Sequence, residues 1–143
     1  MKPKILLRIA SIVMVLHDIG HMGGSLTWKQ AADPEKQQVI NQMTEHKFPF
    51  MGAMRSMGDY YDGYGYASAL AILLISIILW IISDSATQNP NLAKKILIAV
   101  STILLAWGIN ELIFFFPFAA SFSLLAFALT VIAILHLNAG TKQ

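Results

Sequence analysis

The chain has 143 residues, of which 56% are hydrophobic and only 13% are charged, and its formal net charge is +2. Soluble proteins carry about 25% charged residues, so this composition favours a membrane protein with one domain's worth of chain. The absence of cysteine excludes disulfides and thiolate ligands. The scattered basic residues argue against a nucleic-acid partner, which requires a clustered basic face.

Four apolar stretches have the roughly 20 residues that a membrane-spanning helix needs. They lie at about 4–23, 63–83, 94–116 and 118–138. The first has basic residues before its apolar run, like a signal peptide. The apolar run ends in His17-Asp18 instead of a small-residue cleavage site, and we interpret the segment as a retained span. Asn91 is a candidate cap for the third span, and Pro117 is tolerated as an early residue of the fourth. The short link at Pro117 predicts an antiparallel hairpin of the last two spans.

The distribution of lysine and arginine near the span ends predicts the orientation. Compact basic groups fall on one side of the predicted bundle, at Lys2, Lys4, Arg8, Lys94, Lys95 and Lys142. Basic residues between the first two spans are instead spread among acidic ones. We therefore expect both termini in the cytoplasm, the loop 24–62 outside, and the protein in the inner membrane of a bacterium.

The segment 25–62 is too long and too patterned for a slack linker. Residues 33–35 (Asp-Pro-Glu) combine a helix cap, a proline at the first helical position and an acid in the first turn. They predict a short amphipathic helix over about 33–46. Residues 48–51 (Phe-Pro-Phe-Met) are expected to pack into the bundle mouth or the lipid interface. The tyrosine-rich residues 59–66 lead into the second span, where tyrosines are ordinary interface anchors.

Ionisable groups inside a span are costly and by default mark function. With a rise of about 1.5 Å per residue, His17 and His21 lie about 20 and 25 Å along the first span. By the same count Glu111 lies about 24 Å along the third. His21 and Glu111 are therefore expected at nearly one level, in the outer third of the membrane core. His136 falls at the opposite side. Small residues on the fourth span, including Ser123, are interpreted as a packing face and not as a site.

The predicted site is a cluster near the outer ends of the spans. Its expected ligand-binding members are His17, Asp18, His21, Trp107, Asn110 and Glu111, covered from the outer loop by Asp59, Asp62 and Tyr64. His17 and His21 are four residues apart and share one helix face. Trp107 lies one turn from Glu111 and would form the apolar wall.

Three interpretations of this cluster stay open. In a structural one, histidine and glutamate pair because neither can remain unpaired in hydrocarbon. In the second, they form the polar end of a ligand pocket, with His17, His21 and Glu111 as candidate catalytic proton-transfer groups. In the third, the same three residues, with Asp18 as a substitute for Glu111, hold zinc or another divalent metal in an open site. Haem is disfavoured because the two histidines have no histidine at matched depth on another span.

Residues 17–21, 26–30, 48–52 and 63–66 carry a resemblance that covers nearly the whole chain. They resemble segments of a small, functionally uncharacterised family of bacterial four-span membrane proteins, which implies no activity. In architecture alone, the chain is also similar to the emopamil-binding (EXPERA) class, with four or five spans and a long loop after the first. That similarity implies a lateral pocket for sterol-like or amine ligands, by analogy of fold only.

The sequence therefore predicts a single all-α domain over residues 1–143, an antiparallel four-helix membrane bundle with an outer cap. Our function hypothesis is binding of a hydrophobic or amphipathic small molecule in an outward-facing, polar-ended pocket. The alternatives are a structural or accessory membrane protein and a His/Glu metal-dependent enzyme. The expected partner is the lipid bilayer, and homo-oligomer formation stays open.

Overall fold

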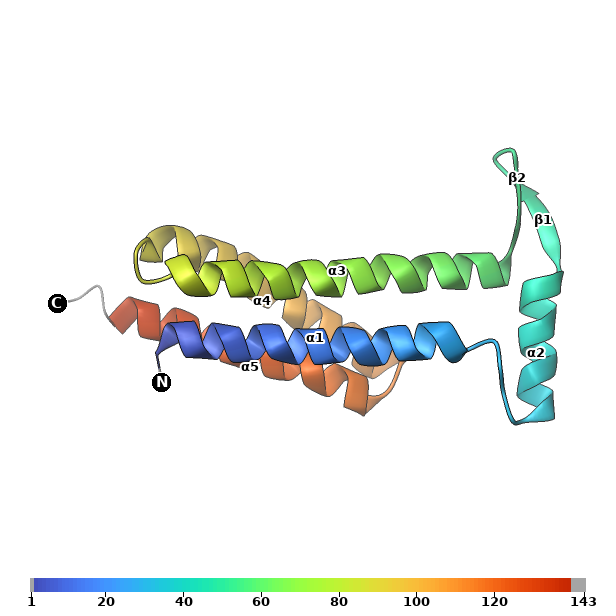
Figure 1. Cartoon of the computed structure of the whole chain (residues 1–143), viewed down its shortest axis with the longest axis horizontal. Coiled ribbons are helices and arrows are strands. Elements are labelled where there is room, and N and C mark those ends of the chain that lie inside the picture. The colour runs from blue at the N-terminus through green and yellow to red at the C-terminus, as the bar shows by residue number, and fades with distance from the viewer. Residues whose placement is uncertain (1, 140–143) are drawn as a thin grey trace. The chain divides into compact units, whose positions relative to one another are not determined.

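The structure is a computed structural model that describes residues 2–139. The described residues form five helices and one hairpin, labelled in Figure 1: α1 (Pro3–Thr27), α2 (Pro34–Glu45), β1 (Lys47–Phe50), β2 (Ala53–Ser56), α3 (Met57–Ser85), α4 (Pro90–Phe114) and α5 (Pro117–Ala139). α1, α3, α4 and α5 are long and apolar enough to cross a membrane. The predicted all-α, four-span fold is therefore confirmed. Lys142, which the orientation prediction used, lies outside the described residues.

Side-chain caps and prolines determine where α2, α4 and α5 begin. Asp33 accepts hydrogen bonds from the backbone N–H groups of residues 35 and 36 at 2.8 and 3.3 Å, and Pro34 opens α2, as predicted. The predicted cap of α4 was wrong by two positions. Asn89, not Asn91, accepts the N–H of Leu92 at 3.2 Å, because Pro90 then occupies the first helical position, where no N–H is needed. Pro117 begins α5 as expected.

α3 begins at Met57, well before the predicted boundary at about residue 63. Ser56 and Asp59 form a reciprocal capping pair. The Ser56 backbone N–H donates to Asp59 Oδ2 at 2.8 Å, and the Asp59 N–H donates to Ser56 Oγ at 3.1 Å. Such a pair satisfies two of the N–H groups that a helix start leaves free. The tyrosine-rich segment is therefore the first part of the helix itself, not an approach to it.

The hairpin of β1 and β2 was not predicted. The strands pair antiparallel from Lys47 with Ser56 to Phe50 with Ala53. Met51 and Gly52 form a two-residue turn, and both have positive φ, 46° and 85°. Right-handed strand twist favours such turns in tight hairpins, although a side chain at positive φ is uncommon.

The chain divides into two compact units, which are described separately. The first comprises residues 1–18 and 72–143, and in it α4 and α5 pack antiparallel with the first part of α1 and the last part of α3. Its centre consists of large, fully buried side chains: Leu7, Met14, Ile72, Leu79, Leu97 and Leu104. α4 and α5 lie close together at Gly108, where an added Cβ would lie 2.7 Å from the Leu124 side chain. The second unit, residues 19–71, holds the end of α1, α2, the hairpin and the start of α3.

Candidate functional site

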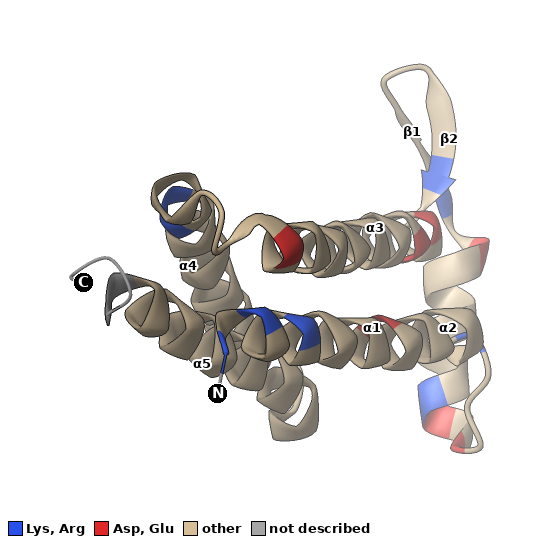
Figure 2. Ribbon diagram, turned by 60° about the vertical axis from the view of Figure 1, so that its left-hand side comes forward, with Lys and Arg blue, Asp and Glu red and all other residues tan. Residues whose placement is uncertain are grey.

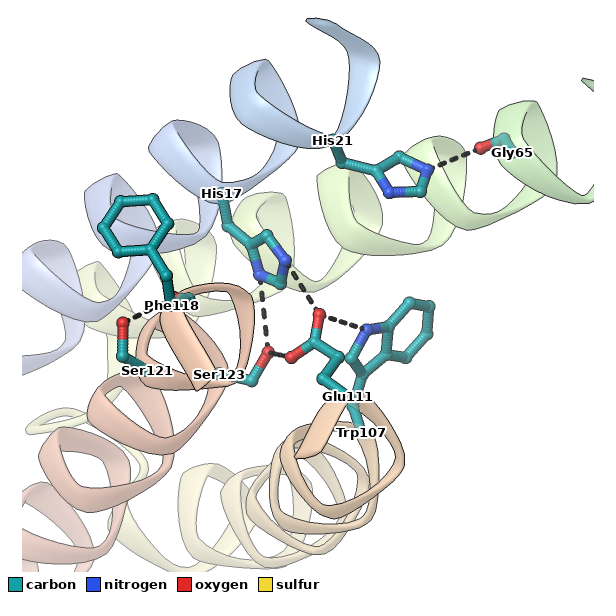
Figure 3. Close-up of polar contacts among 8 residues, drawn as sticks. All are labelled: His17, His21, Gly65, Trp107, Glu111, Phe118, Ser121 and Ser123. Carbon is teal, nitrogen blue, oxygen red and sulfur yellow. Dashed lines mark hydrogen bonds and ion pairs between the residues drawn. The ribbon is translucent and has the colours of Figure 1, made fainter. Parts of the chain in front are cut away.

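Within the first unit, three polar side chains from three helices converge on the carboxylate of Glu111, as Figure 3 shows. Glu111 Oε1 of α4 lies 2.8 Å from His17 Nε2 of α1 and accepts the Trp107 Nε1–H at 3.2 Å. Glu111 Oε2 accepts the hydroxyl of Ser123, on α5, at 2.7 Å. Ser123 Oγ also lies 3.4 Å from His17 Nδ1. We call His17, Trp107, Glu111 and Ser123 the His–Glu cluster.

The cluster is enclosed by the bundle. The side chains of His17 and Glu111 are 5% and 6% exposed, and Ser123 is fully buried. The His17 ring also stacks on Phe122 with ring centroids 5.6 Å apart. A charge in such a place is tolerated only when it is paired and hydrogen-bonded, and here both carboxylate oxygens have partners.

The ring of contacts His17–Ser123–Glu111 admits two proton arrangements. In one, the Ser123 hydroxyl donates to an ionised Glu111, and both nitrogens of a protonated His17 donate. In the other, a protonated Glu111 donates to Ser123, which donates to Nδ1 of neutral His17, while Nε2–H donates to Glu111. Both satisfy every donor and leave the cluster without net charge, as burial requires.

His17, not the expected His21, is therefore the histidine that contacts Glu111. The His21 ring, in the second unit, lies 2.9 Å from the carbonyl oxygen of Gly65 through Nε2 (Figure 3). Asp18, next to His17, is half-buried, and Asn110, next to Glu111, is exposed. Asp18 and Asn110 are thus both less buried than His17 and Glu111, their neighbours in the sequence.

Asp62 belongs to a separate clamp within the second unit. Its carboxylate accepts Trp28 Nε1–H at 2.7 Å and pairs with Lys29 Nζ at 2.6 Å. Trp28 also packs on Tyr61 with ring centroids 4.5 Å apart. The hydrogen bond to Asp62 raises the pKa of Lys29 above its ordinary value. The clamp ties the segment after α1 to the first turns of α3, and its acid is fully engaged.

Asp59 and Tyr64 line an open hollow of about 530 Å³ in the second unit. Its walls are one face of the hairpin and one face of α3: Phe50, Met51, Ala53, Arg55, Asp59, Tyr60, Gly63, Tyr64 and Ala67. Tyr60 packs edge-on against Phe50, with ring centroids 6.0 Å apart. Space above Gly63 is open, since an added Cβ would meet nothing within 4 Å. We call this space the hairpin hollow.

Metal binding would need more donors than the His–Glu cluster supplies. An open zinc site uses three protein ligands, whereas His17 and Glu111 are two. Among the described residues, no three His, Asp or Glu side chains lie close enough together to hold a metal ion. The arrangement is suited to holding a proton between buried partners more than to binding a divalent cation.

Two features of the sites were missed in the sequence. Ser123 had been assigned to a packing face, yet it is one of the donors to Glu111. A serine at helical spacing among alanines carries no signal that separates the two roles. The hairpin hollow was missed because the hairpin was missed. The sequence Met51-Gly52 lacks the usual asparagine or aspartate before the glycine.

Comparison with protein-family models, with curated proteins and with solved structures finds no match to this chain. No family is therefore identified, and the part of the expected resemblance that is shown is the presence of four long apolar helices. On that evidence, the chain is a multi-pass membrane protein built on an antiparallel bundle of four helices.

Proposed function

We propose that this membrane protein binds a small amphipathic molecule in the hairpin hollow. The observation that carries the proposal is the hollow itself, which has about 530 Å³ between the hairpin and α3. Small-molecule sites typically have about 300–1,000 Å³, with mainly apolar and aromatic walls and a few polar groups. The hollow meets both conditions, and two residues expected in a ligand site, Asp59 and Tyr64, line it.

The lining suggests how such a molecule would lie. Phe50, Tyr60 and Tyr64 offer aromatic faces to its apolar part or to a cationic group. Arg55 and Asp59 supply one charge of each sign for its polar end. The similarity in architecture to the emopamil-binding class makes amines and sterol-like molecules the first probes to screen.

The His–Glu cluster is better explained as a device that fixes helix packing, the second candidate function. It links α1, α4 and α5 through contacts of 2.7 to 3.4 Å, and its two ionisable side chains are at most 6% exposed. Polar side chains that bond across helices in this way stabilise membrane bundles. The cluster then needs no ligand to satisfy it.

We also propose that both termini face the cytoplasm of a bacterium and that the loop 24–62 lies outside. The basic residues of the first unit support this, because Figure 2 shows them in blue near the beginnings of α1 and α4. Lysine and arginine are concentrated on the cytoplasmic side of membrane proteins. A reporter enzyme fused after Gln143 should be active only in its cytoplasmic form. Activity of a periplasmic reporter there would reverse the assignment.

The binding proposal is tested by the small molecules that remain with the purified protein. Mass analysis of an organic extract should find one compound class with the wild type. Tyr64→Ala removes an aromatic wall that is 72% exposed, and Gly63→Phe fills the hollow, so both should lose that compound. Tyr66→Ala is the matched control, since Tyr66 does not line the hollow. Equal retention by all four proteins, or loss in the control alone, would contradict the proposal.

A further inference from the structure

A second, narrower hollow lies within the first unit, between α1 and α3. It has about 240 Å³ and is lined by Ser11, Val15, Leu73, Ser76, Ile77, Trp80 and Ile81. The two serines are small, so the helices leave a slot above them, and the larger residues form its sides. We call this the α1–α3 groove.

The floor of the groove is apolar in effect, although two serines form it. The Ser11 hydroxyl donates to the Ser76 carbonyl at 2.9 Å, and the Ser76 hydroxyl donates to the Ser11 carbonyl at 3.0 Å. The two hydroxyl oxygens are themselves 3.0 Å apart. Since each proton is committed to the opposite backbone, the groove offers no free donor to a ligand. An apolar chain fits it better than a polar group does.

One end of the groove carries charge. Arg8 lies over the Trp80 ring, with its guanidinium carbon 4.7 Å from the ring centroid. Asp84, one turn beyond Trp80, accepts Arg8 at 3.0 Å and Lys4 at 2.7 Å on the same oxygen, Oδ1. Two cations share one anion, so this end keeps a net charge of +1. Both cations are well exposed, with side chains 38% exposed for Arg8 and 48% for Lys4.

From these observations we propose that the α1–α3 groove is a binding site for an anionic phospholipid of the bilayer. One acyl chain lies in the slot between Val15 and Ile77, and the phosphate lies against Lys4 and Arg8. At about 1.5 Å per residue, the distance from Leu73 to Asp84 is about 16 Å, which suits a chain that enters the membrane from a headgroup at the charged end. A tryptophan between apolar and charged zones is typical of the level where headgroups begin.

The charge balance selects an anionic headgroup over a zwitterionic one. Asp84 compensates only one of the two cations, and a phosphate with no cation of its own supplies the second negative charge. A basic residue near an anionic lipid surface contributes about 1 kcal/mol, or about fivefold in affinity. A headgroup that carries its own amine gains much less.

The experiment compares the lipids that stay bound after purification. The protein is reconstituted in nanodiscs of equal phosphatidylglycerol and phosphatidylcholine, released into mild detergent and analysed by native mass spectrometry. The wild type should retain one phosphatidylglycerol in clear preference to phosphatidylcholine. Arg8→Gln should reduce that preference about fivefold, whereas Lys95→Gln, which removes the same charge from the exposed start of α4, should leave it unchanged.

A second pair of variants tests the slot. Val15→Trp places a bulky ring in the groove and should abolish retention of both lipids, while Ile98→Trp, on an exposed position of α4, should not. Equal loss of preference in Arg8→Gln and Lys95→Gln would reveal diffuse attraction without a site. Equal retention of the two lipids by the wild type, or unaltered retention by a folded Val15→Trp protein, would overturn the proposal.

Discussion

Replacing Glu111 by alanine tests the energetic importance of the His–Glu cluster most directly. The change removes the acceptor of three donors, His17, Trp107 and Ser123, and leaves them enclosed in the bundle. Interhelical hydrogen bonds in a membrane protein average about 0.6 kcal/mol each, so the two that join Glu111 to α1 and α5 give a lower bound of about 1 kcal/mol. Breaking a buried ion pair by removing one partner costs about 3–5 kcal/mol. We therefore expect Glu111→Ala to lose about 3 kcal/mol of unfolding free energy.

The measurement is equilibrium unfolding in mixed micelles with increasing dodecyl sulfate, followed by circular dichroism. Glu111→Gln keeps the volume and one acceptor and should lose about half as much as Glu111→Ala. Asn110→Ala is the control, because Asn110 is exposed on the same helix, and it should change stability by less than about 0.5 kcal/mol. In a double-mutant cycle, adding His17→Ala to Glu111→Ala should cost little more, since the pair is already broken. A loss below about 1 kcal/mol for Glu111→Ala, or an equal loss for Asn110→Ala, would refute the cluster as a stabilising device.

Further predictions concern packing and capping. Gly108→Ala should destabilise the α4–α5 contact by about 1–3 kcal/mol, because the new methyl group would meet Leu124 at 2.7 Å. Gly20→Ala is the control, because an added Cβ there meets nothing within 4 Å, and it should gain up to about 1 kcal/mol of stability from helix propensity. The same unfolding assay compares the two variants, and equal effects on stability would refute the packing argument. Ser56→Ala should remove the cap shared with Asp59 and cost about 1 kcal/mol. Hydrogen exchange should then quicken in the first turn of α3, and unaltered exchange there would show that the cap contributes nothing.

The parts of the fold that could be predicted are those that depend on residues close together in the sequence. Runs of about 20 apolar residues locate the four long helices, because a helix satisfies all backbone hydrogen bonds of one such run within the run itself. The cap at Asp33 was predictable because its hydrogen bonds reach only to the next turn. The signal for the start of α3 was also local, in Ser56 and Asp59. It was missed because the tyrosines that follow were interpreted as interface anchors before the span. The hairpin turn at Met51 depends on strand pairing, which overrides the preference of a methionine for negative φ.

The candidate site shows the limit of estimating membrane depth from the number of residues along a helix. Glu111 was expected opposite His21 and contacts His17, one turn away. A difference of one turn is about 5.4 Å, which is smaller than the error in where each span begins and how far it tilts. Side-chain direction around the helix decides the partner, and that depends on how α1 packs on α4 and α5. Residue types on separate spans do not specify this packing.

The partners of Glu111 also bear on the order in which the bundle assembles. Trp107 is in the same helix, and Ser123 is in the helix that follows a short turn at Pro117. When α4 and α5 enter the membrane together as a hairpin, the acid already has two donors, so no unsolvated carboxylate faces lipid alone. His17 lies on α1, which is synthesised first, and it becomes the third partner of Glu111 when α1 packs against the hairpin. The hairpin of α4 and α5 therefore carries two hydrogen-bond partners for its own carboxylate into the membrane, and the packing of α1 adds the third.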